Sequence, residues 1–384
     1  MDYLDKVSKN VNSIEISGIR KFYNKLSDYP DAISLTLGQP DFDVPEKIKA
    51  AIISAINENK TTYTSNAGIP ELRQGICNYL KGFDISFKPE EVCITVGGSE
   101  GLMDVFAALL NPGEKVLIPT PAYPAYESCV KLIGGEIVNY NLKDDFSIDF
   151  VALEGLLKTE KPKLMVVSYP SNPTGAVLGA EDKKRLQRFI KDNDIIVISD
   201  EIYSSLCFEP EYHSICQFED IRDKVVLVSG FSKMFSMTGL RLGFVCAVQG
   251  YMDSIIKVHQ YNVSCAPSIV QWGACEGLRE CMGDVEHMRS QFIKRRDYLY
   301  NELKRLGFDM YMPKGAFYMF PGIKKFNMKS DDFCERLLKE AGVAIVPGTA
   351  FGKGGEGYIR ISYAYSMEQL MECVKRIEKF ISKI

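Results

Sequence analysis

The segment 229–243 holds the residues whose types and spacing most strongly suggest chemistry. It follows an apolar, β-branched run, and Lys233 stands in it among aromatic and sulfur-containing neighbours. A lysine amine that is partly desolvated in such surroundings has a lowered pKa and can act as a nucleophile. Ser232 and Arg241 lie in the same loop. Because an isolated lysine is far more often a solvated surface residue, the prediction of a site depends on the spacing of these three residues.

A glycine-rich turn at residues 97–101 permits three interpretations. Its letters Gly-Gly-Ser-Glu-Gly follow a predicted strand and open an apolar helix, and the free N–H groups of a helix N-terminus bind phosphate. The letters also match the G-x-S-x-G pattern of α/β-hydrolases, with Ser99 as the nucleophile. Such a hydrolase needs a late histidine, and none follows His287. The third interpretation is a plain structural turn, so this motif alone decides nothing.

Polar residues follow two other predicted strands. Asn172 stands in the Pro-Ser-Asn-Pro-Thr-Gly segment 170–175, which is either a structural turn or a place where an amide contacts a ligand. Asp200 and Tyr203 lie in the segment 199–203. An aspartate at that position is either a helix N-cap or a buried acid that faces a ligand. Ligands of open parallel sheets bind beyond the carboxyl ends of the strands, so these residues are candidates for one site.

The elements that must position these residues alternate along the middle of the chain. Short apolar, β-branched runs are separated by segments of helical periodicity, which predicts βαβ units and a mainly parallel sheet. Strands of such a sheet are buried on both faces and therefore nearly continuous in apolar residues. The predicted class is α/β. The predicted strands are 92–96, 116–119, 164–168, 195–199, 225–229 and 243–248.

Near residue 280 the sequence changes in character. A long helix that ends at Leu306, followed by short strand-like pieces, predicts a smaller α+β domain. The last helix is expected to begin near Ser366, with Gln369 completing a capping box. Its periodicity predicts one buried face made of Met367, Leu370, Met371, Val374, Ile377 and Ile381.

These patterns predict three regions. Residues 1–44 lack a core pattern of their own and are expected to pack with the small domain and close over the site. Residues 45–280 form the large domain, which would bind any cofactor, and residues 281–384 form the small C-terminal domain.

Composition excludes several classes of protein. Lys and Arg number 46 and Asp and Glu 50, so the formal charge is −4, which is unlike a nucleic-acid binder that works by electrostatics. No apolar run approaches the roughly 18 residues of a membrane span, and the polar N-terminus is unlike a secretory signal. Eleven scattered cysteines without a CxxC pair fit neither a disulfide scaffold nor a zinc cluster. We expect a cytoplasmic protein without nucleic-acid, membrane or metal partners.

Taken together, the motifs resemble those of the fold-type-I, pyridoxal-phosphate-dependent aminotransferases of class I and II, in the same order and over nearly the whole chain. The most specific match is S-K-x-x-x-M-T-G-x-R-x-G, which covers residues 232–243. Residues 16–22 and 259–265 look closest to the branch labelled N-acetyl-LL-diaminopimelate aminotransferase, beside the aspartate and aromatic enzymes. Further matches lie at residues 37–42, 63–68, 121–124, 170–175, 199–203, 315–318 and 358–362.

The resemblance implies a fold and a reaction. The large domain would have three layers around a mainly parallel sheet with one antiparallel strand, beside a smaller α+β domain. The enzyme would move an α-amino group between an amino acid and a 2-oxo acid with pyridoxal 5′-phosphate as cofactor. The resemblance also suggests cis peptide bonds at Thr120-Pro121 and Asn172-Pro173.

Three residues are implied as catalytic. Lys233 would bind the cofactor as a Schiff base and move a proton between the substrate Cα and the cofactor C4′. Asp200 would pair with the pyridine nitrogen and keep it protonated. Tyr63 would reach the phosphate from the other subunit, so the active site would be shared within a homodimer.

Further cofactor and substrate contacts are implied in the same way. Tyr123 would stack on the ring, Asn172 and Tyr203 would hydrogen-bond its phenolic oxygen, and Gly98, Ser99, Ser232 and Arg241 would hold the phosphate. Some relatives have a serine where Gly230 stands here, so the phosphate site would depend more on Ser232. Arg360 would bind the substrate α-carboxylate as a bidentate fork, with Gly38 and Asn172 beside it. Arg20 and Lys21 are candidates for a distal carboxylate, although a solvated basic pair is an equal alternative.

Two other functions remain open at this point. A C–S β-lyase, or another pyridoxal-phosphate enzyme acting on amino acids, would use the same lysine and aspartate. A non-catalytic sensor of this fold would need an additional DNA-binding domain, for which the N-terminal residues give no match.

Overall fold

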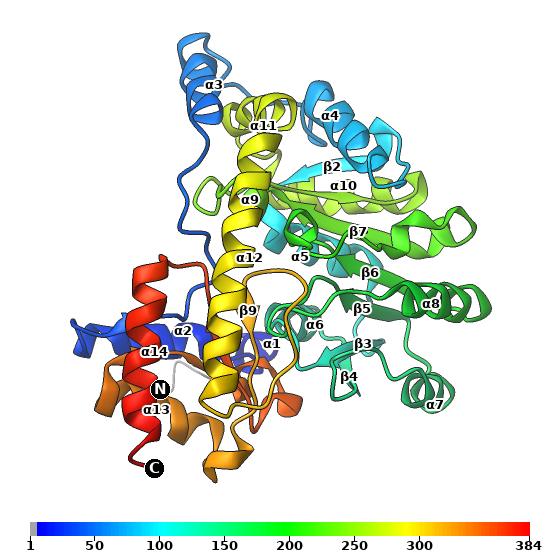
Figure 1. Ribbon diagram of the computed structural model, residues 1–384. Coiled ribbons are helices and arrows are strands. Elements are labelled where there is room, and N and C mark those ends of the chain that lie inside the picture. The colour runs from blue at the N-terminus through cyan, green and yellow to red at the C-terminus, as the bar shows by residue number, and fades with distance from the viewer. Residues whose placement is uncertain (1–5) are drawn as a thin grey trace.

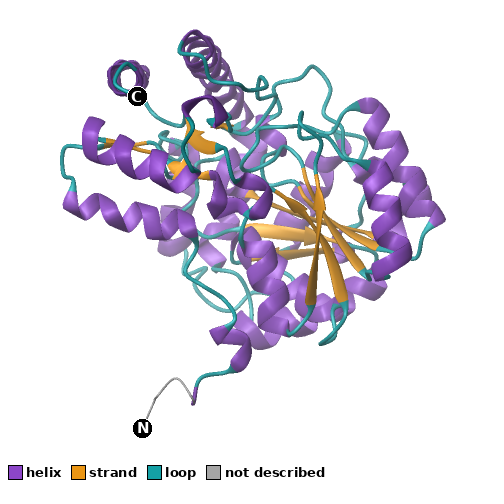
Figure 2. Cartoon of the chain, turned by 90° about the horizontal axis from the view of Figure 1, so that it is seen from below, coloured by secondary structure: helices purple, strands orange, loops and turns teal. Residues whose placement is uncertain are grey.

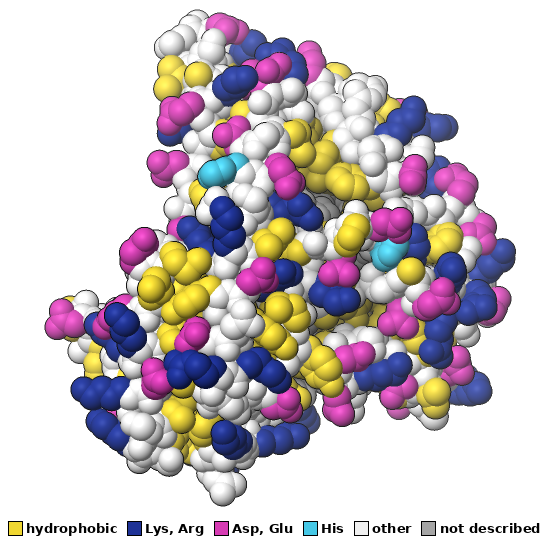
Figure 3. Space-filling view, in the orientation of Figure 1, with side chains coloured by type: hydrophobic (Ala, Val, Ile, Leu, Met, Phe, Trp, Pro, Cys, Tyr) yellow, Lys and Arg dark blue, Asp and Glu magenta, His cyan; other side chains and the backbone are white. Residues whose placement is uncertain are grey.

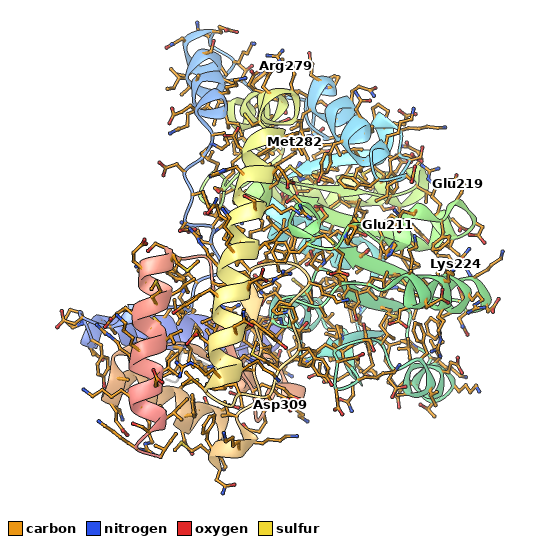
Figure 4. The ribbon with its side chains drawn as sticks, viewed as in Figure 1. Glu211, Glu219, Lys224, Arg279, Met282 and Asp309 are labelled. Carbon is orange, nitrogen blue, oxygen red and sulfur yellow. The ribbon has the colours of Figure 1, made fainter. Side chains whose placement is uncertain are left out.

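The structure is a computed structural model that describes residues 6–384. It has a large part, built on a seven-stranded sheet, and a smaller part beside it. A long helix, α12 (Met282–Arg305), runs from the large part at the top of Figure 1 to the small part at the bottom. Met282, at the start of this helix, lies in the upper part of the view with side chains, and Asp309, just after its end, lies in the lower part (Figure 4). One continuous helix thus links the two parts.

The large sheet has the strand order β2-β8-β7-β6-β5-β3-β4. All neighbouring strands pair in parallel except that β8 runs antiparallel to both β2 and β7. The prediction of a mainly parallel sheet with one antiparallel strand is confirmed. The strands are β2 (Val92–Thr95), β3 (Lys115–Thr120), β4 (Glu136–Asn141), β5 (Leu164–Ser168), β6 (Ile196–Asp200), β7 (Val225–Gly230) and β8 (Gly243–Cys246).

Helices cover both faces of this sheet and complete the three layers (Figure 2). Side chains alternate between the two faces, so Val116 and Ile118 join one apolar core while Leu117 joins the other. The edge strand β4 was not predicted, because its sequence Glu-Ile-Val-Asn-Tyr-Asn is half polar and only Tyr140 in it is buried. The helices are α3 (Glu46–Asn57), α4 (Pro70–Lys81), α5 (Gly97–Leu109), α6 (Ala125–Ile133), α7 (Phe150–Glu160), α8 (Ala180–Asp192), α9 (Phe231–Met234), α10 (Gln249–Val263) and α11 (Ser268–Glu280).

The smaller part is an α+β arrangement with its own apolar core. Three antiparallel strands follow the order β11-β12-β9, and a separate parallel pair joins β1 to β10. The strands are β1 (Ile33–Ser34), β9 (Tyr318–Met319), β10 (Val343–Ala344), β11 (Val346–Pro347) and β12 (Ile359–Ser362), and the helices are α13 (Ser330–Ala341) and α14 (Met367–Ile381). The pairing of β1 with β10 attaches the N-terminal segment to this part.

The N-terminal segment contacts the small part again and also reaches the large part. The short helix α2 (Gly18–Asn24) packs so closely that a Cβ on Gly18 would lie 2.7 Å from the Ala350 Cβ. The preceding helix α1 (Lys9–Asn12) lies against α6, where the Asn10 side chain donates to the Leu132 carbonyl across 3.0 Å. The segment therefore bridges the two parts at the mouth of the site described below.

The last helix begins as predicted but buries a different set of residues. Ser366 and Gln369 form the expected capping box. Met371 was predicted in the buried face, yet 44% of it is exposed. Cys373 and Phe380 are buried instead. An α-helix turns 100° per residue, so a predicted apolar face that is rotated slightly from the buried one includes a residue at its exposed edge, which here is Met371.

Both predicted cis peptide bonds, Thr120-Pro121 and Asn172-Pro173, are present, and Tyr169-Pro170 is also cis. Acidic and basic side chains are interspersed over the face shown in Figure 3, with no extended region of one sign on that face. Among residues 6–384, no helix has the length and apolar character needed to cross a membrane.

Candidate active site

Lys233 lies on the short helix α9, which directly follows strand β7. Its Nζ donates to the Gly38 carbonyl across 2.5 Å and lies 5.9 Å from the ring centroids of Tyr203 and Phe317. Burial, helped by the positive charges of Arg241 and Arg360, lowers the pKa of the Lys233 amine to about 8, against the opposing effect of Asp200. A substantial fraction of this amine is therefore neutral near physiological pH, as a nucleophile or base requires.

Asp200 is the last residue of strand β6 and is buried. The Tyr126 hydroxyl donates to its Oδ2 across 2.6 Å, and the Ile202 N–H donates to its Oδ1 across 3.1 Å. Burial raises the pKa of the Asp200 carboxyl, while these two hydrogen bonds and the charge of Lys233 lower it. Asp200 is therefore a buried acid that lines the cavity, and its contact with a ligand stays a prediction. Such a carboxylate can hold a proton on a ligand nitrogen.

The N-terminus of α5 forms a close-packed turn beside Arg241. Gly97 has a φ of +78°, and a Cβ there would lie 2.8 Å from the Arg241 Nη2. A Cβ on Gly243 would lie 2.6 Å from the Gly97 carbonyl carbon. Only glycine at positions 97 and 243 leaves room for the two backbone segments and the Arg241 guanidinium to lie this close together. Free N–H groups at a helix end, an arginine and the hydroxyls of Ser99 and Ser232 together form a donor set suited to a phosphate.

Arg360 lies on β12 and is 1% exposed. Its Nη1 donates to the Asn172 Oδ1 across 3.0 Å, and its Nη2 donates to the Thr36 carbonyl. Within residues 6–384 its Nε has no hydrogen-bond partner, and no Asp or Glu forms an ion pair with it. A buried guanidinium without an acidic partner is costly. The arrangement is suited to a carboxylate that arrives with a ligand.

A cavity of about 330 Å³ brings the predicted residues together. Its lining includes every residue predicted for the site except Lys21 and Tyr63, and Tyr63 is 85% exposed in the loop between α3 and α4. Of the two basic candidates near the N-terminus, Arg20 lines the cavity, whereas Lys21 lies outside it and pairs with Glu15. The predicted lining residues are Arg20, Gly38, Gly98, Ser99, Tyr123, Asn172, Asp200, Tyr203, Ser232, Lys233, Arg241 and Arg360.

Sequence reasoning missed two residues that hold this lining in place. Tyr126, the partner of Asp200, lies in the first turn of α6, three residues after Tyr123, and the two rings meet edge to face at 5.7 Å. The Tyr318 hydroxyl is hydrogen-bonded to the Tyr203 hydroxyl across 2.7 Å, and its ring lies 4.4 Å from the Arg360 guanidinium carbon. The Tyr126 spacing was visible in the sequence, whereas the contacts of Tyr318 cross between distant segments.

The residues present fit pyridoxal phosphate. The cavity has a glycine turn whose donors suit a phosphate, a buried carboxylate that could pair with a ring nitrogen, an aromatic wall at Tyr123 and an amine of lowered pKa, each on a different loop beyond the sheet. In addition, the Arg360 Nε has no hydrogen-bond partner among the described residues and could donate to a carboxylate.

Comparison with known proteins gives the family. Residues 30–377 match the family "Aminotransferase class I and II". The chain belongs to this family. Aminotransferases of this class use pyridoxal 5′-phosphate and act on amino acids and 2-oxo acids, so the predicted family, fold, cofactor and reaction class are confirmed. The comparisons thereby favour transamination over the β-lyase alternative.

Several relatives of this aminotransferase cover its whole length. A probable N-acetyl-LL-diaminopimelate aminotransferase of Bacillus subtilis is 44% identical over 98% of this chain and 96% of the relative. An aspartate aminotransferase of Pyrococcus abyssi is 39% identical over 98% of each chain. The structure of an aspartate aminotransferase from Thermus thermophilus with maleate has a TM-score of 0.93 and 33% identity, over 97% of this chain and 99% of that one. These relatives differ in named substrate, so similarity alone does not give the substrate here.

Proposed function

We propose that this aminotransferase uses Lys233 as the proton-transferring base, Asp200 as the carboxylate that would pair with the ring nitrogen of the cofactor and Arg360 as the α-carboxylate site. When bound, pyridoxal phosphate supplies an electron-withdrawing ring and a carbonyl group that takes up the amino group. The observation that supports the proposal is that Lys233 and Arg360 line one cavity, the first with a pKa of about 8 and the second without an acidic partner among the described residues.

The roles of the residues follow from their surroundings. Lys233, neutral in part near pH 8, would accept a proton from the substrate Cα and deliver it to the cofactor C4′. Asp200, oriented by Tyr126, holds a proton on the ring nitrogen. Arg360 offers parallel N–H donors to a carboxylate, and its contact with Asn172 fixes the plane of the guanidinium. Every α-amino acid brings such a carboxylate, whatever its side chain.

We propose further that one substrate has a second carboxylate, as glutamate and aspartate do, and that Arg20 binds it. Arg20 lines the same cavity as Arg360, and in the described part of the chain its guanidinium forms no ion pair. A relative of this fold was solved with maleate, which is a dicarboxylate. Relatives are named for aspartate and for N-acetyl-LL-diaminopimelate, which also have a carboxylate beyond the α-carboxylate.

A homodimer is part of the proposal. Tyr63 and Tyr261 are 85% and 89% exposed, which is unusual for large apolar side chains. Tyr63 does not line the cavity of its own chain, so a contribution to a second copy gives its exposure a reason. We keep the cytoplasm as the proposed location, in line with eleven cysteines that are all unpaired.

Single-turnover half-reactions, followed by the absorbance of the bound cofactor, test the proposal. Glutamate, aspartate and N-acetyl-LL-diaminopimelate are each expected to convert the cofactor to its amine form. Glutamine, which matches glutamate in shape but lacks the distal charge, is expected to react more slowly. Release of pyruvate and ammonia from a cysteine-type substrate, without conversion of the cofactor, would instead favour a β-lyase.

A further inference from the structure

A buried cluster of three ionisable side chains lies behind the N-terminal turn of α5. Glu100 and Asp104 are four residues apart on α5 and face the same way, and His259 projects from α10 between them. The His259 Nδ1 lies 2.8 Å from the Glu100 Oε1 and 3.5 Å from the Asp104 Oδ2. The side chains of His259 and Asp104 are fully buried, and that of Glu100 is 8% exposed. None of the three belongs to the lining of the cavity.

Glu100 connects this cluster to the phosphate-binding turn. Its second oxygen, Oε2, accepts a hydrogen bond from the Val96 N–H, at the point where strand β2 ends and α5 begins. Glu100 also directly follows Ser99 in the chain. The orientation of its carboxylate therefore affects the shape of the turn 97–99, and that carboxylate is in turn held by His259.

The charges of the cluster require a cation. Two carboxylates this close and this buried repel each other, and neither oxygen of Asp104 has a hydrogen-bond partner in the described part of the chain. Burial opposes a charge on His259, but the hydrogen bond to Glu100 and the negative charges of Glu100 and Asp104 outweigh it and raise the pKa of His259 to about 9. Burial also raises the pKa of Asp104 to about 6. Near neutral pH the histidine is thus an imidazolium between two carboxylates.

We infer that His259 is a positioning residue for the cofactor phosphate, acting through Glu100 on the turn at the start of α5. Its positive charge offsets a carboxylate that stands next to a phosphate ligand, and its hydrogen bond keeps that carboxylate on the Val96 N–H. Without His259, the buried carboxyl groups of Glu100 and Asp104 would lack a cationic partner behind the phosphate site. The inference rests on the proposed role of this turn in holding the phosphate.

Affinity for pyridoxamine 5′-phosphate and for pyridoxamine separates the phosphate contribution from the rest of the site, because neither compound forms a bond to Lys233. Calorimetric titration of the cofactor-free protein is expected to show much tighter binding of the phosphate ester by the wild type. His259→Asn is expected to weaken binding of the ester by about 10- to 100-fold, the range of a charge-assisted hydrogen bond, and to leave pyridoxamine unchanged. His287→Asn, at an exposed histidine, is the matched control.

A second substitution distinguishes electrostatics from simple damage to the fold. Asp104→Asn removes one negative charge, so it is expected to restore much of the lost affinity when combined with His259→Asn. In a wild-type background Asp104→Asn is expected to retain or strengthen binding of the phosphate ester, which tests the inference even if His259→Asn does not fold. The ³¹P resonance of the bound ester is expected to shift in His259→Asn and to return toward its original position in the double variant.

Several results would overturn the inference. If His259→Asn weakened binding of pyridoxamine 5′-phosphate and of pyridoxamine equally, His259 would have a general packing role. The same would follow if the losses of affinity for the phosphate ester from His259→Asn and Asp104→Asn simply added in the double variant. A stoichiometric divalent metal in the purified wild type, lost in His259→Asn, would identify the cation as a metal ion instead of a proton. If the wild type itself shows no preference for the phosphate ester, the proposed phosphate site is wrong and the inference falls with it.

Discussion

The Arg360 guanidinium donates to the Asn172 side-chain oxygen across 3.0 Å and so connects the small part of the molecule to the large one. Arg360 belongs to strand β12, and Asn172 lies in the loop that follows strand β5. A substrate carboxylate that binds Arg360 would therefore touch a group whose position depends on both parts. Binding would favour the arrangement in which the small part and the N-terminal segment lie close over Lys233 and exclude water.

Arg360→Lys is expected to lower kcat/KM for all amino acid and 2-oxo acid substrates by a similar factor. Lysine offers a point charge in place of two parallel donors. Loss of the paired hydrogen bonds to the carboxylate corresponds to a decrease of about 30- to 1,000-fold in kcat/KM. The absorbance of the bound cofactor is expected to remain unchanged. Steady-state kinetics with three substrates of different side chain would check this. If one substrate class kept its full rate, Arg360 would recognise a side chain, and the α-carboxylate site would lie elsewhere.

Borohydride reduction of the cofactor-loaded protein is expected to attach the cofactor to the peptide that contains Lys233. Lys233 is the lysine whose amine lies in the cavity with its pKa lowered to about 8. Lys233→Ala is expected to bind the cofactor without a covalent bond and to lose turnover by several orders of magnitude. Peptide mass spectrometry locates the label. Label on another lysine would refute the assignment.

The cofactor-free protein is expected to gain stability between about pH 8 and pH 10.5 because of Lys233. Its folded pKa is about 8, whereas the unperturbed value is 10.5. In that window the folded amine has lost its proton and the unfolded amine has kept it, so unfolding takes up a proton and a rise in pH opposes it. Thermal denaturation of the wild type and Lys233→Met over this range provides the measurement. A stability difference that stays constant with pH would show that the amine is not perturbed.

Much of the site was predictable because chain-local patterns specify it. The glycine turn at 97–101, Asp200 at the end of a strand and the loop with Lys233 each follow an apolar run, and parallel strands bring their carboxyl ends to one edge. The family resemblance then added Arg360, whose strand gives no sign of the site by itself. Sequence spacing alone would not have placed a residue of the small part in this cavity.

The features of the fold and the site that the sequence did not predict depend on contacts between segments far apart in the chain. Strand β4 was missed because an edge strand with one buried side chain lacks the apolar run that identifies its neighbours. The imidazole of His259 meets Glu100 only because α10 packs on α5, and nothing in the local sequence of either helix indicates this. Likewise, the choice between Arg20 and Lys21 needed the direction of α2, which the sequence left open.

Arg20→Gln is expected to slow the half-reaction of glutamate by about 3- to 30-fold, as the loss of a partly exposed charge pair with a ligand would do. The half-reaction of glutamine, which has no distal charge, is expected to change little. Lys21→Gln is the matched control, because Lys21 pairs with Glu15 outside the cavity. Equal slowing of both substrates by Arg20→Gln would mean that Arg20 shapes the entrance and does not bind the distal carboxylate.

Tyr126→Phe is expected to shift the acidic limb of the pH profile toward neutral pH. The Tyr126 hydroxyl donates to Asp200 across 2.6 Å and lowers the pKa of that carboxyl against the effect of burial. Without this donor the pKa of Asp200 rises, so a smaller fraction is ionised at a given pH and the ring nitrogen is less well protonated. A lost hydrogen bond to a charged group corresponds to a decrease of about 10- to 100-fold in the single-turnover rate for every substrate.

Tyr140→Phe is the control, because the buried hydroxyl of Tyr140 donates to the Val166 carbonyl across 2.8 Å and lies outside the cavity. If Tyr126→Phe behaved like Tyr140→Phe, with a loss of thermal stability and an unchanged pH profile, Tyr126 would support the fold and would not set the charge of Asp200.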